Sequence, residues 1–227
     1  MYYLYDPTLL FLIPAIILSV WAQFKVKHTF NRYSKVNAAS GMTGAELAKR
    51  LLQDHGLHQV TIEEIGGELS DHYDPRSYVL RLSSGVARSK SVASLGVAAH
   101  EVGHAVQHQK AYQPFQIRRA IAPVVGFGSK MAFPLIFIGL IMSLPMLFDV
   151  GIVLFSGAVL FQLITLPVEF NASGHALAIL KNRGYLAAEE VKDAKKVLNA
   201  AALTYVAATA VAVLQLIRLL VLRNTRE

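Results

Sequence analysis

Four long apolar runs constrain this chain more than any other feature of its sequence. The runs cover residues 9–24, 131–148, 150–168 and 200–222. Runs of about 20 apolar residues can cross the hydrocarbon core of a bilayer. The composition agrees, because only 16% of the residues are charged, whereas soluble domains average about 25%. We therefore predict a mainly α-helical membrane protein with four transmembrane helices and a lipid bilayer around them.

The distribution of charge predicts how the chain crosses the membrane. No Lys or Arg precedes the first run, which argues against a cleaved signal peptide, and four basic residues follow it within residues 25–35. Because Lys and Arg gather in cytoplasmic loops, we expect the N-terminus outside and the next segment in the cytoplasm. The basic region 169–199 fits the same side. Arg223 and Arg226 would then lie outside, against the rule.

This alternation divides the chain into five expected segments. They are an N-terminal transmembrane helix (1–24), a cytoplasmic segment (25–118), a transmembrane hairpin (119–168) with Asp149 at its turn, a cytoplasmic helix or loop (169–199), and a C-terminal transmembrane helix (200–227). The cytoplasmic segment reads as a small α+β unit. Its expected elements are a helix opened by the capping box Thr43-x-x-Glu46, strands at 60–65 and 78–82, and a helix at 91–111. The strand at 78–82 could offer an open edge to an extended peptide.

Net charge and cysteine content limit the possible partners. The formal charge is +7, but no basic patch interleaved with aromatic residues is present, so we expect no nucleic-acid partner. Membrane topology accounts for the basic excess instead. The chain has no cysteine. Any metal must therefore be held by histidine and carboxylate side chains.

The segment His100-Glu101-Val102-Gly103-His104 has the pattern HExxH. On a helix, residues four apart share one face, so both imidazoles can reach one ion. Glu101 follows the first ligand and can act as general base toward a zinc-bound water, whose pKa falls to about 7. Gly103 allows a close approach by another segment. The pattern therefore predicts a zinc site with Glu101 as its catalytic group.

A catalytic zinc takes three protein ligands, so one ligand beyond the two histidines is required. The candidates are His108, Glu169, His175 and His72. On a straight helix His108 would lie about 12 Å from His100 along the axis, at 1.5 Å per residue, so the three imidazoles could not converge. Glu169 is favoured, because a carboxylate directly after an apolar run is costly unless it is used.

Three stretches carry a family resemblance: LSDHYDPRSYVLRLS, VAAHEVGHAVQH and LPVEFNAS. They resemble the YugP-like putative neutral zinc metallopeptidases, a bacterial membrane family, which is similar in motif order to the heat-shock membrane peptidases and the CAAX prenyl proteases. The resemblance implies zinc held by His100, His104 and Glu169, with Glu101 as the catalytic acid and base. It also implies a protein or peptide substrate and a place in the bacterial cell membrane.

The residues after Glu169 depart from the related peptidases. There the third ligand begins a Glu-x-x-x-Asp pattern, whose Asp orients a ligand histidine. Here Ser173 stands at that position and Asn171 is the other nearby polar group, so either could take the orienting role. His175 could stabilise the oxyanion or be an ordinary polar residue. Three residues of a polar turn could bound a substrate groove, although turn chemistry explains the last one equally well: Asp71, His72 and Asp74.

Together these observations predict a membrane-embedded zinc endopeptidase with its site on the cytoplasmic side. The residues favour this function over two alternatives. Intramembrane proteolysis is disfavoured, because Lys90 and Lys110 bound the motif helix. A non-catalytic scaffold with a structural or relic zinc is disfavoured by the intact Glu101, which a structural site does not need.

Overall fold

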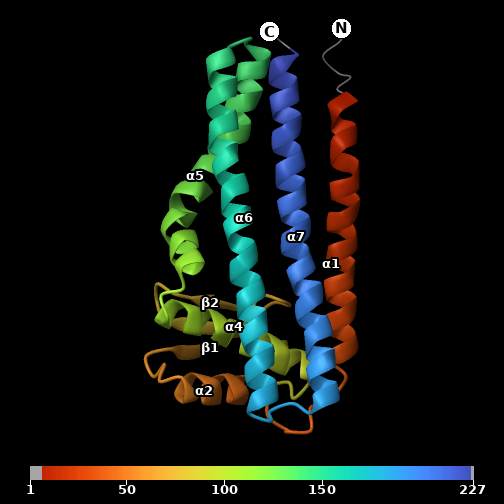
Figure 1. Cartoon of the computed structure of the whole chain (residues 1–227), viewed down its shortest axis with the longest axis vertical. Coiled ribbons are helices and arrows are strands. Elements are labelled where there is room, and N and C mark those ends of the chain that lie inside the picture. The colour runs from red at the N-terminus through yellow and green to blue at the C-terminus, as the bar shows by residue number, and fades with distance from the viewer. Residues whose placement is uncertain (1–6, 226–227) are drawn as a thin grey trace. The chain divides into compact units, whose positions relative to one another are not determined.

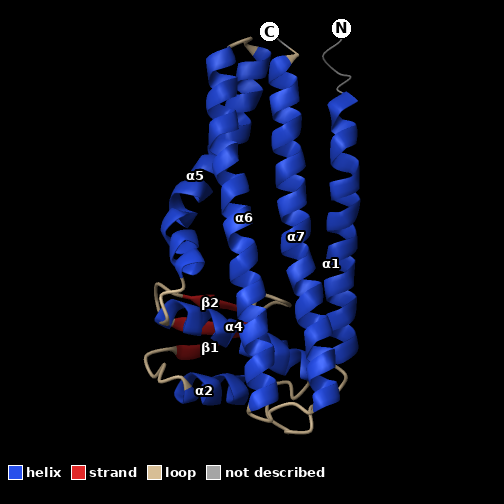
Figure 2. Cartoon of the chain, in the orientation of Figure 1, coloured by secondary structure: helices blue, strands red, loops and turns tan. Residues whose placement is uncertain are grey.

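The computed structural model describes residues 7–225, and these are mainly helical with one small sheet (Figure 2). The elements in chain order are η1 (Pro7–Leu12), α1 (Ile13–Tyr33), α2 (Gly44–Asp54), β1 (Thr61–Ile65), β2 (His72–Asp74), β3 (Val79–Ser83), α3 (Ser84–Ala87), α4 (Val92–Gln109), α5 (Gln113–Ile141), α6 (Pro145–Asn182) and α7 (Ala188–Asn224). The predicted fold class is therefore confirmed. Within the described residues, four helices are long and apolar enough to cross a membrane, namely η1 with α1, α5, α6 and α7.

The chain forms two compact units. One, the helical unit, comprises Met1–Gln23, Gln116–Pro167 and Thr204–Glu227. The other, the mixed unit, comprises Phe24–Phe115 and Val168–Leu203.

Apolar side chains cover the outer surface of the helical unit. Ile17, Phe127, Val153 and Leu220 are all exposed. In water such a surface would drive aggregation. In a bilayer such an apolar surface contacts lipid chains favourably. The helices then pack against one another through small residues. Figure 1 shows α5, in green, and α6 joined by a tight turn and running back along one another.

The turn between α5 and α6 lies earlier than the sequence predicted. It covers residues 142–144, with Ser143 at a φ of +53°, and Asp149 is already on α6. Glycines bring the two helices together, because a Cβ on Gly139 would lie 2.6 Å from the Phe148 nitrogen and one on Gly151 would lie 2.9 Å from the Ala132 carbonyl oxygen. The prediction of a turn at Asp149 was wrong, because this interhelical packing and not the charge sets the position.

Asp149 forms a bidentate ion pair with Arg223. Its carboxylate accepts from Arg223 Nε at 2.6 Å and from Nη2 at 3.2 Å. Bidentate pairs of this kind are the strong form of the arginine–carboxylate contact. Arg223, which we expect outside against the positive-inside rule, therefore has a carboxylate partner that offsets its charge.

The mixed unit contains the sheet, whose strand order is β1-β3-β2. β1 runs parallel to β3, and β2 runs antiparallel to it. β3 is thus central, and the prediction that the strand at 78–82 offers an open edge was wrong. The strand that escaped prediction is β2, since three residues are too few to show a pattern and its pairing with β3 defines it. The capping box of Thr43 and Glu46 is confirmed at the start of α2.

Helix α4 forms the centre of the mixed unit. Ser91 caps it by accepting from the Ser94 N–H, and most of its residues are buried. Its Ala and Gly residues are small and leave room for close neighbours. The surrounding core includes Leu51 of α2, Leu82 of β3 and Leu180 of α6. α4 is not among the helices apolar enough to cross a membrane in the described part of the chain. A buried helix of the mixed unit therefore carries the HExxH segment.

Candidate metal centre

Three side chains converge in the mixed unit. His100 and His104 stand one turn apart on α4, and Glu169 stands on α6. Glu169 Oε2 lies 3.3 Å from His100 Nε2 and 3.6 Å from His104 Nε2. One ligand atom from each residue lies within 4.8 Å of the others, which is close enough for all three to hold one ion.

The chemistry of these donors fits zinc. The side chain of Glu169 is only 2% exposed, and a carboxylate buried that deeply requires a compensating positive charge. Two imidazole nitrogens and one carboxylate oxygen are a donor set of catalytic zinc sites, which keep a fourth position open. The three residues therefore offer three of the four ligands of a catalytic zinc site.

A glycine allows the two helices to meet at this point. A Cβ on Gly103 would lie 2.9 Å from the carbonyl oxygen of Ala172, which is closer than real Cβ contacts come. Glycine at position 103 thus lets α4 approach the α6 backbone near Glu169.

The outer nitrogens of both histidines have partners. Ser173 Oγ lies 3.1 Å from His100 Nδ1, and Gln107 Oε1 lies 3.0 Å from His104 Nδ1. These contacts orient the rings so that each Nε2 faces Glu169. Asn171 contacts no ligand histidine in this way; its Oδ1 accepts from Gln107 Nε2 at 2.8 Å. Gln107 escaped prediction, although its place three residues after His104 puts it on the same helix face.

Glu101 lies beside this group and is 7% exposed. Burial raises the pKa of its carboxyl to about 7, while His100 and the backbone N–H of Tyr73 on β2 lower it. A carboxyl with a pKa near neutrality can both accept and release a proton at that pH.

The other candidate histidines lie outside the group. His108 Nδ1 lies 3.0 Å from the Tyr73 hydroxyl. His72 Nδ1 lies 2.8 Å from the Ser70 carbonyl oxygen, and His175 Nδ1 lies 2.9 Å from the Asn171 carbonyl oxygen on its own helix. Each has local contacts that account for its position.

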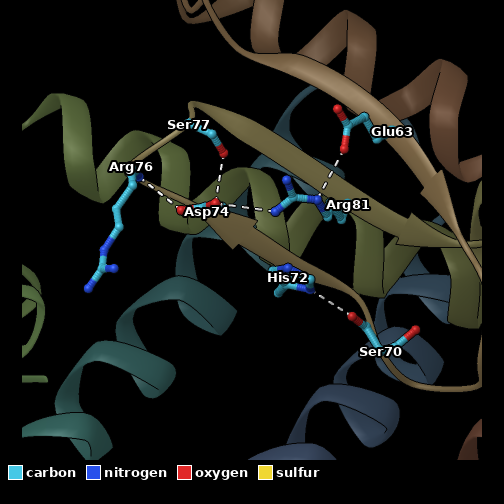
Figure 3. A network of polar contacts seen from close by, with 7 residues as sticks. All are labelled: Glu63, Ser70, His72, Asp74, Arg76, Ser77 and Arg81. Carbon is cyan, nitrogen blue, oxygen red and sulfur yellow. Dashed lines mark hydrogen bonds and ion pairs between the residues drawn. The ribbon is translucent and has the colours of Figure 1, made fainter. Parts of the chain in front are cut away.

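Two aspartates of the predicted polar turn hold the sheet together. Asp74 accepts from Ser77 Oγ at 2.7 Å, from the Arg76 N–H at 2.9 Å and from Arg81 at 3.2 Å, and Arg81 also donates to Glu63 of β1 (Figure 3). These donors, Ser77 first, lower the pKa of Asp74 to about 2. Asp71 accepts from the Ser83 N–H and hydroxyl. Both carboxylates thus connect β2, or the turn just before it, to β3.

Comparison with known proteins identifies the family. A family model described as "Putative neutral zinc metallopeptidase" matches residues 8–224. The chain belongs to this family. The chain is also 50% identical over 217 residues to "Putative membrane protease YugP" of Bacillus subtilis (strain 168), which covers 95% of this chain and 96% of that protein. No solved structure matches the chain.

The predicted resemblance to YugP-like neutral zinc metallopeptidases is therefore confirmed. The family's name specifies zinc, and the group of His100, His104 and Glu169 offers the donors that zinc accepts. In this family member the hydroxyl of Ser173 contacts Nδ1 of His100, the ring nitrogen that faces away from Glu169.

Proposed function

We propose that this chain is a membrane-embedded zinc endopeptidase that hydrolyses peptide bonds in protein or peptide substrates. His100, His104 and Glu169 would hold the zinc, and Glu101 would act as general base and then general acid. The observation that carries this proposal is the convergence of two imidazole nitrogens and a buried carboxylate oxygen within 4.8 Å, with Glu101 adjacent in sequence to His100.

The residues of the chain would divide the chemistry between them. Zinc, when bound, supplies a Lewis acid that polarises the scissile carbonyl and lowers the pKa of water. Glu101 takes the proton of the attacking water and passes it to the leaving amine. The burial of Glu101 raises its pKa, which favours the carboxyl form that donates a proton in the second transfer.

β2 is an edge strand of the sheet, and we propose that an extended peptide pairs with it. β2 pairs with β3 on one side only, and the backbone N–H of Tyr73 is close enough to Glu101 to lower its pKa. A peptide that added to this edge as a further strand would use main-chain hydrogen bonds, which do not depend on its sequence. Its scissile bond would then pass Glu101. This edge takes the role that the sequence had suggested for residues 78–82.

We further propose that the site faces the cytoplasm of a bacterial cell. The support is the basic cluster at residues 25–35, which follows an apolar run and would stay on the cytoplasmic side. The relative from Bacillus subtilis is named "Putative membrane protease YugP", which supports the membrane part of this proposal.

The rival function is a non-catalytic membrane scaffold that keeps a structural or relic zinc. The two functions separate in a Glu101→Gln variant of the purified, zinc-loaded protein, tested on a mixed library of fluorogenic peptides. General acid–base catalysis contributes about 10²–10⁴-fold, so the variant should lose at least 100-fold in cleavage rate while it keeps its zinc. If the wild-type protein cleaves no peptide and the variant supports growth as well as the wild type does, the chain is a scaffold.

A further inference from the structure

The side chain of Gln107 links the two helices of the metal centre. It is 2% exposed. Its Oε1 lies 3.0 Å from His104 Nδ1, and its Nε2 donates to the Val168 carbonyl oxygen at 2.9 Å and to Asn171 Oδ1 at 2.8 Å. All of its amide atoms are therefore engaged inside the protein.

These partners fix which way the amide points. A backbone carbonyl only accepts, so the amide nitrogen must face Val168, and its second hydrogen goes to Asn171. The amide oxygen is left to face His104. That oxygen can only accept, so His104 carries its hydrogen on Nδ1 and presents the lone pair of Nε2 toward Glu169.

The same side chain also holds the third candidate ligand. Val168 directly precedes Glu169, and Asn171 follows it by two residues. Gln107 thus fastens the stretch of α6 that carries Glu169 to the turn of α4 that carries His104. By contrast, the Ser173 hydroxyl contacts His100 Nδ1 and lies on the same helix as Glu169.

We propose that Gln107 is the positioning residue of this metal centre: it selects the metal-binding tautomer of His104 and sets the distance between His104 and Glu169 before any metal binds. The inference rests on the proposed zinc site. It assigns to an uncharged amide, contributed by the HExxH helix itself, the orienting role that a carboxylate has in the related peptidases.

The test measures zinc affinity, not hydrolysis. Full-length protein in detergent is stripped of metal, and its zinc dissociation constant is determined by competition with a chromophoric chelator. Loss of an outer hydrogen bond to a metal ligand typically weakens affinity about 10–100-fold, so Gln107→Met should show a loss in that range. The absorption spectrum of the cobalt-loaded variant should also change, because the ligand geometry is no longer fixed.

Gln109→Met is the matched control. Gln109 stands on the same helix, is exposed, and donates to the His55 carbonyl oxygen away from the site. This variant should bind zinc within twofold of the wild type and keep its cobalt spectrum.

A second variant separates the contact of Gln107 with His104 from its contact with α6. Gln107→Glu keeps an acceptor for His104 Nδ1 but places a carboxylate against the Val168 carbonyl oxygen, so it should also lose at least tenfold in affinity. Wild-type affinity in Gln107→Glu would show that the link to α6 is not needed and would overturn the proposal. So would a Gln107→Met protein that melts at lower temperature without metal yet binds zinc and cobalt as the wild type does. A wild-type chain that binds no zinc would instead refute the proposed metal site itself, and this inference with it.

Discussion

The Tyr73 hydroxyl lies 3.0 Å from His108 Nδ1, and the ring of Tyr78 stacks on the same imidazole at 5.2 Å between centroids. His108 is the third histidine of a series spaced four residues apart, and these contacts engage it outside the group formed by His100, His104 and Glu169. Because α4 rises 1.5 Å per residue, His108 lies too far along it to join His100 and His104. Glu169 from α6 completes the group instead.

The first prediction follows from this arrangement and concerns the third ligand. Glu169→Ala and Glu169→Gln should each reduce bound zinc from one per chain to near zero, because a catalytic site needs three protein ligands and a neutral amide is a poor one. His108→Ala should keep its zinc. Metal content of the purified variants, measured by atomic emission, checks this. Loss of zinc from His108→Ala with retention in Glu169→Gln would place a three-histidine site on α4 instead.

The second prediction concerns the close approach of α4 and α6. Gly103→Ala places a Cβ 2.9 Å from the Ala172 carbonyl oxygen, so the helices must separate and draw Glu169 away from the histidines. Overpacking of this kind typically costs about 1–3 kcal/mol. We expect a lower melting temperature and at least tenfold weaker zinc binding, measured by differential scanning calorimetry and chelator competition.

Gly96→Ala is the control for this prediction, because it lies on the same helix and its Cβ would sit 3.5 Å from the Ala194 Cβ, an ordinary contact. Replacing glycine by alanine in a helix stabilises it by about 0.5–1 kcal/mol. Gly96→Ala should therefore melt at the same or a higher temperature. Equal behaviour of the two variants would mean that α6 does not constrain position 103.

The third prediction concerns orientation in the membrane. The chain contains no cysteine, so a single introduced thiol reports its own location. Lys90→Cys should resist an impermeant maleimide in intact cells, because the mixed unit contains the basic cluster at residues 25–35, which we expect on the cytoplasmic side. Met142→Cys, exposed in the turn between α5 and α6, should react. Both should react after permeabilisation, and the reverse pattern in intact cells would place the site outside.

The fourth prediction concerns acid stability and Asp74. Its pKa is about 2 in the folded protein, below the value of about 3.9 expected for an unfolded chain. A carboxyl with a lowered folded pKa stabilises the protein above its unfolded pKa and loses that effect as the pH falls through its folded pKa. Asp74→Asn should therefore cost about 1–2 kcal/mol at pH 6, allowing for the 28% exposure of this side chain.

The loss of unfolding free energy caused by Asp74→Asn should shrink as the pH falls from about 4 to about 2. Thermal melting of the zinc-free protein at each pH measures it, and the exposed Glu68→Gln is the control. A difference between wild type and Asp74→Asn that stays constant down to pH 2 would show that the charge of Asp74 contributes nothing.

What the sequence determined by itself is local along the chain. The four apolar runs specify helices long enough for a bilayer, because hydrophobic length is read directly from consecutive residues. The capping box at Thr43 and Glu46 is likewise local. So is the shared face of His100 and His104, since a helix brings residues four apart together whatever surrounds it.

The tertiary structure alone decided the relations between distant segments. Pairing made β2 a strand and left β3 without a free edge, although neither fact is visible in their residues. Helix packing moved the hairpin turn ahead of Asp149. Gln107 reaches the Val168 carbonyl oxygen across 61 positions of sequence. Such contacts escape a reading of the sequence because they depend on how whole helices pack, and packing is set by the combined shapes of many side chains and not by any local pattern.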